Sequence, residues 1–468
     1  MALSSNFLRP DLENYKTAAN LAYNNLIKEL IAGGRKIYHF GFGESPFPVP
    51  QAFQQGLIEA ADRNEYLSVE GLLDLRREIL AFHSRYGDFD HFTVDDFVMG
   101  AGSKTIIYHV MSVFGGEIIL FSPSWTSYLP QTQLSGKKAH IIFPSDTKRY
   151  IPSTEDIEKE LKKCDPNIRK ILVLNSPNNP TGITYTEDEI KNIADLCRKY
   201  KIIVLSDEIY ARLSFTKFTS IAKYYPEGTI VLTGFSKWAS IGGWRAGYAL
   251  FPKELHSLKN AVSSAGSHSY TCLPTPIQYA LLKELHSLKN AVSSAGSHSY
   301  TCLPTPIQYA LLKGLQKSEE LDEYIAKCKK VLSFAGKYTY RKLHDAGVEV
   351  HESESSYYCM PNFSNCRTLG VFDGQQLCDK FLEQGNVAFQ PCDPHFLRPI
   401  GELTTRLSFV NFKGEAALNS IELKKEYNEK EQKEFLIKYC PTLIEGIQAL
   451  ADCVQLFKIE KIIDNASS

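Results

Sequence analysis

The stretch TIVLTGFSKWASIGGWRAGY, residues 229–248, places a lysine directly after a short apolar run and an arginine eight residues later. The apolar residues 229–232 read as a buried strand that ends just before Lys237. Burial disfavours the charged ammonium, so a lysine in this position can lose its proton and form a Schiff base. Arg245 can hold a phosphate with its planar guanidinium. Most lysines are surface charges, so the rest of the chain must decide whether this pair is a site.

Outward from this stretch, short apolar runs alternate with amphipathic helical segments such as 187–200. This alternation is typical of a parallel sheet covered by helices on both faces. The expected strands are residues 97–99, 117–121, 140–143, 170–174, 202–205, 230–232 and 247–250. The sequence therefore predicts an α/β fold, whose large domain spans residues 46–317 and contains a mostly parallel seven-stranded sheet.

A second, smaller α+β domain is expected from the N-terminal segment, 1–45, together with the C-terminal third, 318–468. This third reads as long helices with a few strands, and it closes with an amphipathic helix from about 439 to 456. The expected strands of the smaller domain are residues 348–350, 356–360 and 405–410.

Chemically useful residues follow five of the expected strands at their carboxyl ends, where ligands collect in sheets of this kind. The segment GAGSK, 100–104, opens a helix, and its backbone amides can cradle a phosphate. Trp125 offers a flat face for stacking. Two further strands are followed by NSPNNPTG, 175–182, and by SDEIY, 206–210. One rim thus receives a phosphate cradle, an aromatic ring, an amide, a carboxylate and a lysine.

Asp207 is the carboxylate that points most clearly to a ligand. A buried carboxylate is costly unless it meets a cation, and a protonated pyridine nitrogen would serve. Such an ion pair lets the ring of pyridoxal phosphate accept electrons. Tyr210 and Asn179 can both donate a hydrogen bond to the phenolic oxygen of that ring. Taken singly, a helix-capping Asp, an Asn-Pro turn and a core Trp are commoner, but their joint order favours the cofactor site.

From residues 40–46 nearly to its C-terminus, the chain resembles the fold-type I, class I/II pyridoxal-phosphate aminotransferases of the aspartate aminotransferase superfamily. The motifs are NPTG (179–182), DEIY (207–210) and SK with GWR (236–237 and 243–245). The resemblance implies that Lys237, Asp207 and Tyr210 are catalytic. The implied cofactor-binding residues are Lys237, Asp207, Tyr210, Asn179, Trp125, Ser103, Lys104, Ser236, Arg245 and Tyr66; the implied substrate-binding residues are Arg406, Gly43, Asn179, Trp125 and Lys104.

The same resemblance assigns individual roles. Lys237 would be the Schiff-base lysine and proton shuttle, and Asp207 would pair with the pyridine nitrogen. Arg406 would clamp the alpha-carboxylate of the substrate, against which Gly43 would lie. Tyr66 would reach the phosphate of the neighbouring subunit in a homodimer.

Arg245 and the amides of Ser103 and Lys104 would hold the phosphate. Gly234 stands where many relatives have a phosphate-binding serine, so Ser236 or Thr233 could substitute. A second departure is the segment FQPC, 389–392, where relatives commonly have Pro-Gly.

The implied reaction is ping-pong transamination from an L-amino acid to a 2-oxo acid such as 2-oxoglutarate. Lys104 could receive the distal carboxylate of an acidic donor, or it could be a solvated lysine in the first turn of its helix. Aromatic donors remain open. The alternatives are a lyase or synthase on the same scaffold, or an inactive product.

The inactive alternative arises from an internal repeat: residues 254–283 and 284–313 are identical. Solenoid repeats diverge and need several copies, so an in-frame duplication or an error in the gene sequence explains two perfect copies better. We expect one copy to fill the native helix-loop-helix position and the other to bulge out. Residues 269–274, or their copy 299–304, match a loop that contacts the partner's cofactor in relatives, so the extra copy could block dimerisation.

The overall composition is that of a globular protein, with 468 residues, 43% of them hydrophobic, and 52 basic against 53 acidic side chains. A net charge near zero gives no reason to expect nucleic acid or a membrane surface as a partner. No run is long enough to span a bilayer, and no targeting segment is evident. The 11 cysteines lack metal-ligand spacing, which indicates reduced thiols in a cytoplasmic enzyme.

Overall fold

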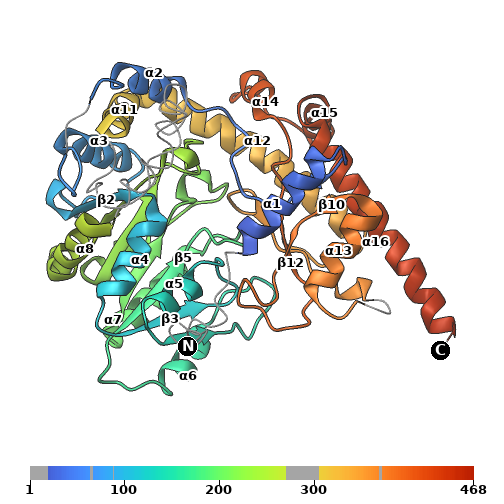
Figure 1. The fold of residues 1–468 in the computed structure, drawn as a ribbon, viewed down its shortest axis with the longest axis horizontal. Coiled ribbons are helices and arrows are strands. Elements are labelled where there is room, and N and C mark those ends of the chain that lie inside the picture. The colour runs from blue at the N-terminus through green and yellow to red at the C-terminus, as the bar shows by residue number, and fades with distance from the viewer. Residues whose placement is uncertain (1–18, 64–66, 88, 270–304, 368–370, 468) are drawn as a thin grey trace, which may run out of the picture.

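The computed structural model describes residues 19–63, 67–87, 89–269, 305–367 and 371–467 (Figure 1). Its centre is a seven-stranded sheet in the order β2-β8-β7-β6-β5-β3-β4, in which β8 alone is antiparallel to its neighbours. The strands are β2 (Phe97–Ala101), β3 (Glu117–Phe121), β4 (Ala139–Ile142), β5 (Lys170–Asn175), β6 (Ile203–Asp207), β7 (Thr229–Gly234) and β8 (Ala246–Leu250). All seven predicted strands are present, with ends shifted by at most two residues, so the α/β fold is confirmed.

Some of the helices cover the two faces of this sheet, and others lie beside it (Figure 1). The helices are α1 (Ala19–Ala32), α2 (Gln51–Glu59), α3 (Leu73–Ser84), α4 (Ser103–Val113), α5 (Tyr128–Leu134), α6 (Thr154–Leu161), α7 (Glu187–Lys199), α8 (His256–Ser269), α11 (Thr305–Leu315), α12 (Ser318–Asp345), α13 (Gly374–Gly385), α14 (Gly414–Ser420), α15 (Glu429–Tyr439) and α16 (Pro441–Ser467). The predicted helix 187–200 corresponds to α7, which begins at a capping box formed by Thr186 and Glu189.

Both faces of the sheet are buried because successive strand residues point to opposite sides. In β3, Ile118 and Leu120 join the apolar cluster that α4 contributes to on one face. Ile119 and Phe121 join the cluster that α6 and α7 contribute to on the other. The near-continuous apolar runs of the sequence are thus explained by helices on both sides.

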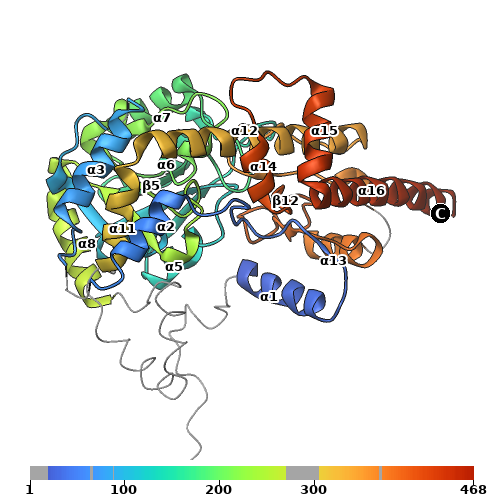
Figure 2. The same ribbon diagram turned by 90° about the horizontal axis from the view of Figure 1, so that it is seen from above.

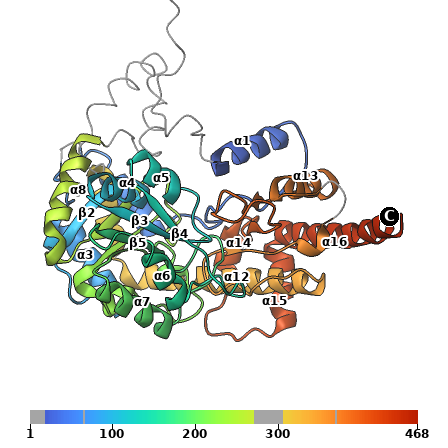
Figure 3. The ribbon, with the colours of Figure 1, turned by 90° about the horizontal axis from the view of Figure 1, so that it is seen from below.

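Two smaller sheets lie beside this layered unit, among α13, α14, α15 and α16 (Figures 1 and 3). In one, β1 (Tyr38–His39) pairs in parallel with β10 (Val387–Ala388). The other is antiparallel, in the order β11 (Gln390–Pro391), β12 (Thr405–Ser408), β9 (Tyr358–Cys359). The predicted strands 356–360 and 405–410 are present as the shorter β9 and β12. The predicted strand 348–350 forms only an isolated bridge, between Glu349 and Asn362.

The C-terminal helix also differs from its predicted bounds. The expected helix 439–456 is divided between the end of α15 and the longer α16, which projects away from the body (Figure 2). The break falls at Cys440-Pro441, and proline is tolerated as a first helical residue because its missing N–H would be unpaired there.

The described residues use part of each repeat copy. Residues 254–269 of the first copy form the end of η7 (Lys253–Leu255) and α8, and Val262 of α8 is buried against the sheet. Residues 305–313 of the second copy form most of α11, where Ile307 and Leu311 are buried. Residues 270–304 lie outside the described residues. The expectation that one copy fills the native position while the other bulges out depends on this segment and stays a prediction.

Nine cysteines are free thiols in the described part of the chain, and all nine are buried. Among the described residues, none of the helices combines the length and apolar character needed to cross a membrane.

Candidate active site

The carboxyl ends of five strands meet at one edge of the large sheet. Strands β2, β3, β5, β6 and β7 all run in the same direction, with β8 reversed among them. A cavity of about 250 Å³ opens at this edge. Eleven of the predicted site residues line it: Gly43, Ser103, Lys104, Trp125, Asn179, Asp207, Tyr210, Ser236, Lys237, Arg245 and Arg406. Tyr66, the twelfth, lies outside the described residues.

One end of the cavity is built to receive an anion. The first N–H groups of α4 have no partner within the helix, and the helix dipole adds positive potential there. Gly102 precedes α4 with a φ of +83°, and a Cβ on it would lie 2.3 Å from the Arg245 Nη2. Arg245 donates to the carbonyls of Gly242 at 3.0 Å and Ala101 at 3.1 Å, which fixes its guanidinium beside the helix.

The glycine at position 234 has a structural reason. A Cβ on Gly234 would lie 2.8 Å from the carbonyl oxygen of Ala246, on the neighbouring strand. Of the two hydroxyls that could substitute for a serine here, Ser236 lines the cavity. Thr233 donates instead to the carbonyl of Glu208 at 3.3 Å. Of the two residues, only Ser236 therefore borders the cavity, and its contact with a phosphate stays a prediction.

Asp207 is a buried carboxylate with two hydrogen-bond donors. Tyr128 donates its hydroxyl to Oδ2 at 2.6 Å, and the Ile209 amide donates to Oδ1 at 3.2 Å. The pKa of Asp207 is raised to about 6. Burial raises this pKa, and the two hydrogen bonds and the charge of Lys237 limit the rise. Tyr128 was missed in the sequence. It lies three residues after Trp125 at the start of α5, where a core tyrosine and a site tyrosine look alike.

Lys237 and Tyr210 line the same cavity. Lys237 is half-buried and donates its ammonium to the carbonyl of Gly43 at 2.9 Å. Its Nζ is 5.8 Å from the centre of the Tyr210 ring. The Tyr210 hydroxyl lies 3.2 Å from that of Tyr358, a cavity residue that sequence reasoning did not select.

Arg406 is buried on β12 and lines the same cavity. It donates to the carbonyl of Gly41 at 2.6 Å and to Oδ1 of Asn179 at 3.4 Å. Its guanidinium lies 4.8 Å from the centre of the Tyr358 ring and 5.2 Å from the centre of the Phe396 ring. Within the described residues, Nε has no hydrogen-bond partner. A buried donor of this kind is ready for a carboxylate ligand.

Lys104 lies inside the cavity rather than on the surface. It is half-buried, and its Nζ is 5.3 Å from the centre of the Trp125 ring. Burial lowers the pKa of Lys104, and the nearby charge of Arg245 lowers it further. Of its two interpretations, a solvated first-turn lysine fits this placement less well than a cation that meets a ligand.

Asn175 is a third cavity residue that sequence reasoning missed. It ends β5, donates to the carbonyl of Asp207 at 3.0 Å and accepts from the amide of Asn179 at 2.8 Å. Its position at the start of the NSPNNPTG segment was visible, but the sequence does not reveal that its side chain ties two strand ends together.

The chain matches the family model for aminotransferase class I and II over residues 35–410. It is 32% identical over 266 residues to an aspartate aminotransferase of Thermotoga maritima, which covers 55% of this chain and 68% of the relative. An aspartate aminotransferase of Geobacillus stearothermophilus is 33% identical over 276 residues, with 57% and 68% covered.

Among solved structures, the aspartate aminotransferase of Thermus thermophilus with maleate has a similar fold, with a TM-score of 0.73 and 21% identity. The similarity covers 95% of this chain and all of that one. The aromatic aminotransferase of Pyrococcus horikoshii gives a TM-score of 0.68 at 21% identity, covering 92% and 99%. The family match spans most of the chain, and the chain therefore belongs to the class I and II aminotransferases.

Proposed function

We propose that this transaminase holds pyridoxal phosphate in the described cavity and moves the amino group of an acidic L-amino acid to a 2-oxo acid in two half-reactions. The cofactor is implied by the family. The observation that carries the proposal is that Lys237, Asp207, Arg245 and Arg406 all line one cavity.

The residues present fit the cofactor. Glycine at position 102 lets the guanidinium of Arg245 lie against the start of α4, because a Cβ there would collide with it, and the backbone N–H groups of that helix start can hold a phosphate. The carboxylate of Asp207 is buried, and a cation on a ring nitrogen would stabilise its charged form. Tyr210 and Asn179 are buried polar side chains at the same cavity and can hold a ring oxygen.

When bound, pyridoxal phosphate supplies an aldehyde that takes up amino groups and a ring that accepts the electrons of the broken alpha C–H bond. In our proposal Lys237 would hold the cofactor at its aldehyde carbon through Nζ. Once the substrate amino group had displaced it, the free amine of Lys237 would move the proton at the alpha carbon. Asp207 would stay ionised and keep a proton on the ring nitrogen, and Arg245, Ser236 and the amides of Ser103 and Lys104 would hold the phosphate.

Substrate recognition would use two cations that line the same cavity, Arg406 and Lys104. Arg406 can bind the alpha-carboxylate through its planar fork, because its Nε is buried without a partner in the described structure. The Lys104 ammonium, held in the cavity beside Trp125, can bind a distal carboxylate. This second cation supports acidic donors over aromatic ones.

A donor panel tests the proposal. Purified protein is loaded with pyridoxal phosphate and assayed with aspartate, glutamate, tyrosine, phenylalanine and alanine against 2-oxo acids that include 2-oxoglutarate and oxaloacetate. We expect amino-group exchange with the acidic donors, and its loss in Lys237→Ala. Release of ammonia or pyruvate without exchange would instead support a lyase on this scaffold. Exchange that persists in Lys237→Ala would contradict the assigned lysine.

Three structural predictions belong to the same proposal. The division into a large domain, 46–317, and a small domain from 1–45 and 318–468 is supported by the pairing of β1 with β10. A homodimer in the cytoplasm, with Tyr66 reaching the partner's phosphate, stays a prediction. Light scattering of the purified full chain measures the dimer directly.

A further inference from the structure

Tyr358 is a buried side chain on the cavity to which the proposed reaction assigns no role. It lies on β9, opposite Ser408 of β12 and therefore close to Arg406. Only 1% of its surface is exposed. A polar side chain this deeply buried needs a partner for its hydroxyl, and the identity of that partner is informative.

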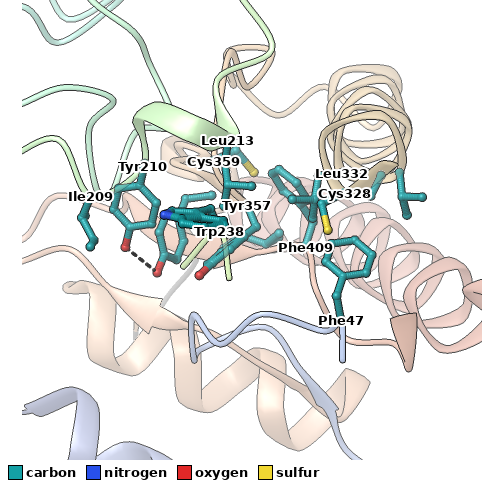
Figure 4. Close-up of a cluster of buried hydrophobic side chains, with 14 of the residues drawn as sticks. Phe47, Ile209, Tyr210, Leu213, Trp238, Cys328, Leu332, Tyr357, Cys359 and Phe409 are labelled. Carbon is teal, nitrogen blue, oxygen red and sulfur yellow. Dashed lines mark hydrogen bonds between the residues drawn. The ribbon is translucent and has the colours of Figure 1, made fainter. Parts of the chain in front are cut away.

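The partner is the hydroxyl of Tyr210, at 3.2 Å. The two rings meet edge to face, with centroids 5.7 Å apart and planes at 85°. Figure 4 shows this hydrogen bond as a dashed line from Tyr210, inside the buried cluster that also contains Tyr357. Tyr358 thus touches the one residue that is proposed both to be catalytic and to hold the ring oxygen of the cofactor.

Two further contacts fix Tyr358 in place. A Cβ on Gly43 would lie 1.8 Å from the Tyr358 hydroxyl oxygen, so the N-terminal segment packs directly on that hydroxyl. The guanidinium of Arg406 lies over the Tyr358 ring, 4.8 Å from the ring centre, in a cation–π contact. One tyrosine therefore contacts three groups that come from distant parts of the chain.

The hydrogen bond between the Tyr210 and Tyr358 hydroxyls limits where each of their protons can point. Burial raises the pKa of Tyr210 well above its usual value, and the neighbouring Tyr358 and Tyr357 raise it further, so its hydroxyl keeps its proton at neutral pH. Each phenol has a single proton to donate. If Tyr358 donates to Tyr210, the proton of Tyr210 is free to point into the cavity. Hydrogen bonds in such a chain also strengthen one another.

We propose that Tyr358 is a positioning residue: its hydroxyl donates to Tyr210, which directs the Tyr210 proton at the phenolic oxygen of bound pyridoxal phosphate, and its ring supports Arg406. The inference rests on the proposed function. The hydroxyl and the ring of Tyr358 thus have separate tasks, one for the cofactor and one for the substrate carboxylate.

The hydroxyl is tested by titrating the absorbance of the cofactor-loaded protein with pH, without substrate. If the Tyr210 proton no longer points at the phenolic oxygen of the cofactor, the negative charge on that oxygen is stabilised less. The bound cofactor should then hold its own proton more tightly. In Tyr358→Phe we expect the proton affinity of the bound cofactor to rise about two- to tenfold, which corresponds to the loss of one neutral hydrogen bond. The matched control is Tyr357→Phe, because the Tyr357 hydroxyl is buried without a hydrogen-bond partner among the described residues. That control should titrate like the wild type.

A double-mutant cycle decides whether the effect passes through Tyr210. On a Tyr210→Phe background, Tyr358→Phe should leave the titration unchanged, because the hydroxyl it would orient is gone. An undiminished shift on that background overturns the inference, as does a Tyr358→Phe protein that titrates like the wild type. A wild-type protein without any titrating absorbance of a lysine-bound cofactor would instead contradict the proposed function, so the two failures are distinguishable.

The ring is tested by steady-state kinetics with an acidic donor. Tyr358→Phe keeps the aromatic face, so KM should stay within about twofold of the wild type while kcat falls. Tyr358→Leu removes the cation–π contact of about 0.5–2 kcal/mol, which corresponds to a KM about two- to thirtyfold higher. Equal KM values in the two variants would contradict the role of the ring. The melting temperature of each variant shows that the comparison is made between folded proteins.

Discussion

Replacing Tyr128 by phenylalanine removes the hydroxyl that donates a hydrogen bond to the buried carboxylate of Asp207. That hydroxyl donates to Asp207 at 2.6 Å, and it opposes the burial that raises the pKa of Asp207 to about 6. A hydrogen bond to a charged group contributes about 1.5–3 kcal/mol, and about 1.4 kcal/mol corresponds to one pKa unit. The Tyr128→Phe protein without cofactor should therefore have an Asp207 pKa of about 7–8.

This shift predicts a pH-dependent loss of cofactor affinity. Binding a protonated ring nitrogen requires the ionised carboxylate, and at pH 7 the variant must first remove a proton that the wild type has already lost. The dissociation constant for pyridoxal phosphate should rise about two- to tenfold at pH 7, and the difference should vanish by about pH 9. The assay is absorbance titration of the apoprotein with the cofactor at several pH values, reported as the ratio of variant to wild type.

The sign of the effect on stability follows from the same pKa. The folded pKa of Asp207 lies above its unfolded value, so the neutral carboxyl contributes stability that is fully present below about pH 4 and is lost as the pH rises through about 6. In Tyr128→Phe this loss should move to about pH 7–8. Tyr185→Phe, at a buried tyrosine in the core cluster on the α6–α7 face of the sheet, is the control. A variant-to-wild-type ratio that stays flat from pH 6 to 9 would refute the reasoning.

Three further predictions concern the substrate, the N-terminal segment and the repeat. Lys104→Met should raise KM for aspartate or glutamate about tenfold and leave KM for alanine nearly unchanged, since only acidic donors have a distal carboxylate. Gly43→Ala should lower kcat/KM at least tenfold, because its methyl would meet the Tyr358 hydroxyl at 1.8 Å; wild-type kinetics would show that the segment can move aside. Deleting 284–313 gives the same sequence as deleting 254–283, and the product should fold with a melting temperature no lower than that of the full chain. A deletion product that is insoluble would mean that the fold needs both copies.

The large sheet was predictable because a strand buried on both faces leaves a near-continuous apolar run in the sequence. Such runs gave all seven strands, and the rule that ligands lie at strand ends placed Asp207 and Lys237 on one rim. Strand direction supplied the rest, since β8 alone runs backwards and leaves the five site-bearing ends together.

Side-chain partners across the chain were not predictable. Tyr358 meets Tyr210 only because β9 and β12 bring the C-terminal third against the ends of the large sheet, and no local pattern encodes that contact. The hydrogen bond from Tyr128 to Asp207 is likewise not encoded by any local sequence pattern. Short strands such as β9 have too few residues for alternation to be visible, which is why the bounds of the smaller sheets were less accurate.

The repeat shows a different limit. Two identical copies have identical propensities, so no sequence pattern can rank them. In the described part of the chain, residues of the first copy follow β8 through η7 into α8, and residues of the second copy form most of α11, which packs on α2 and leads into α12. The segment that would show which copy fills the native position, 270–304, lies outside the described residues.

Chemical trapping shows which lysine carries the cofactor, and we propose that this lysine is Lys237. The cofactor-loaded protein is reduced with borohydride, digested and analysed by mass spectrometry. We expect a phosphopyridoxyl group on the peptide that contains Lys237, at about one per chain. A modification found chiefly on another lysine, such as Lys104, or a protein that carries none, would contradict it.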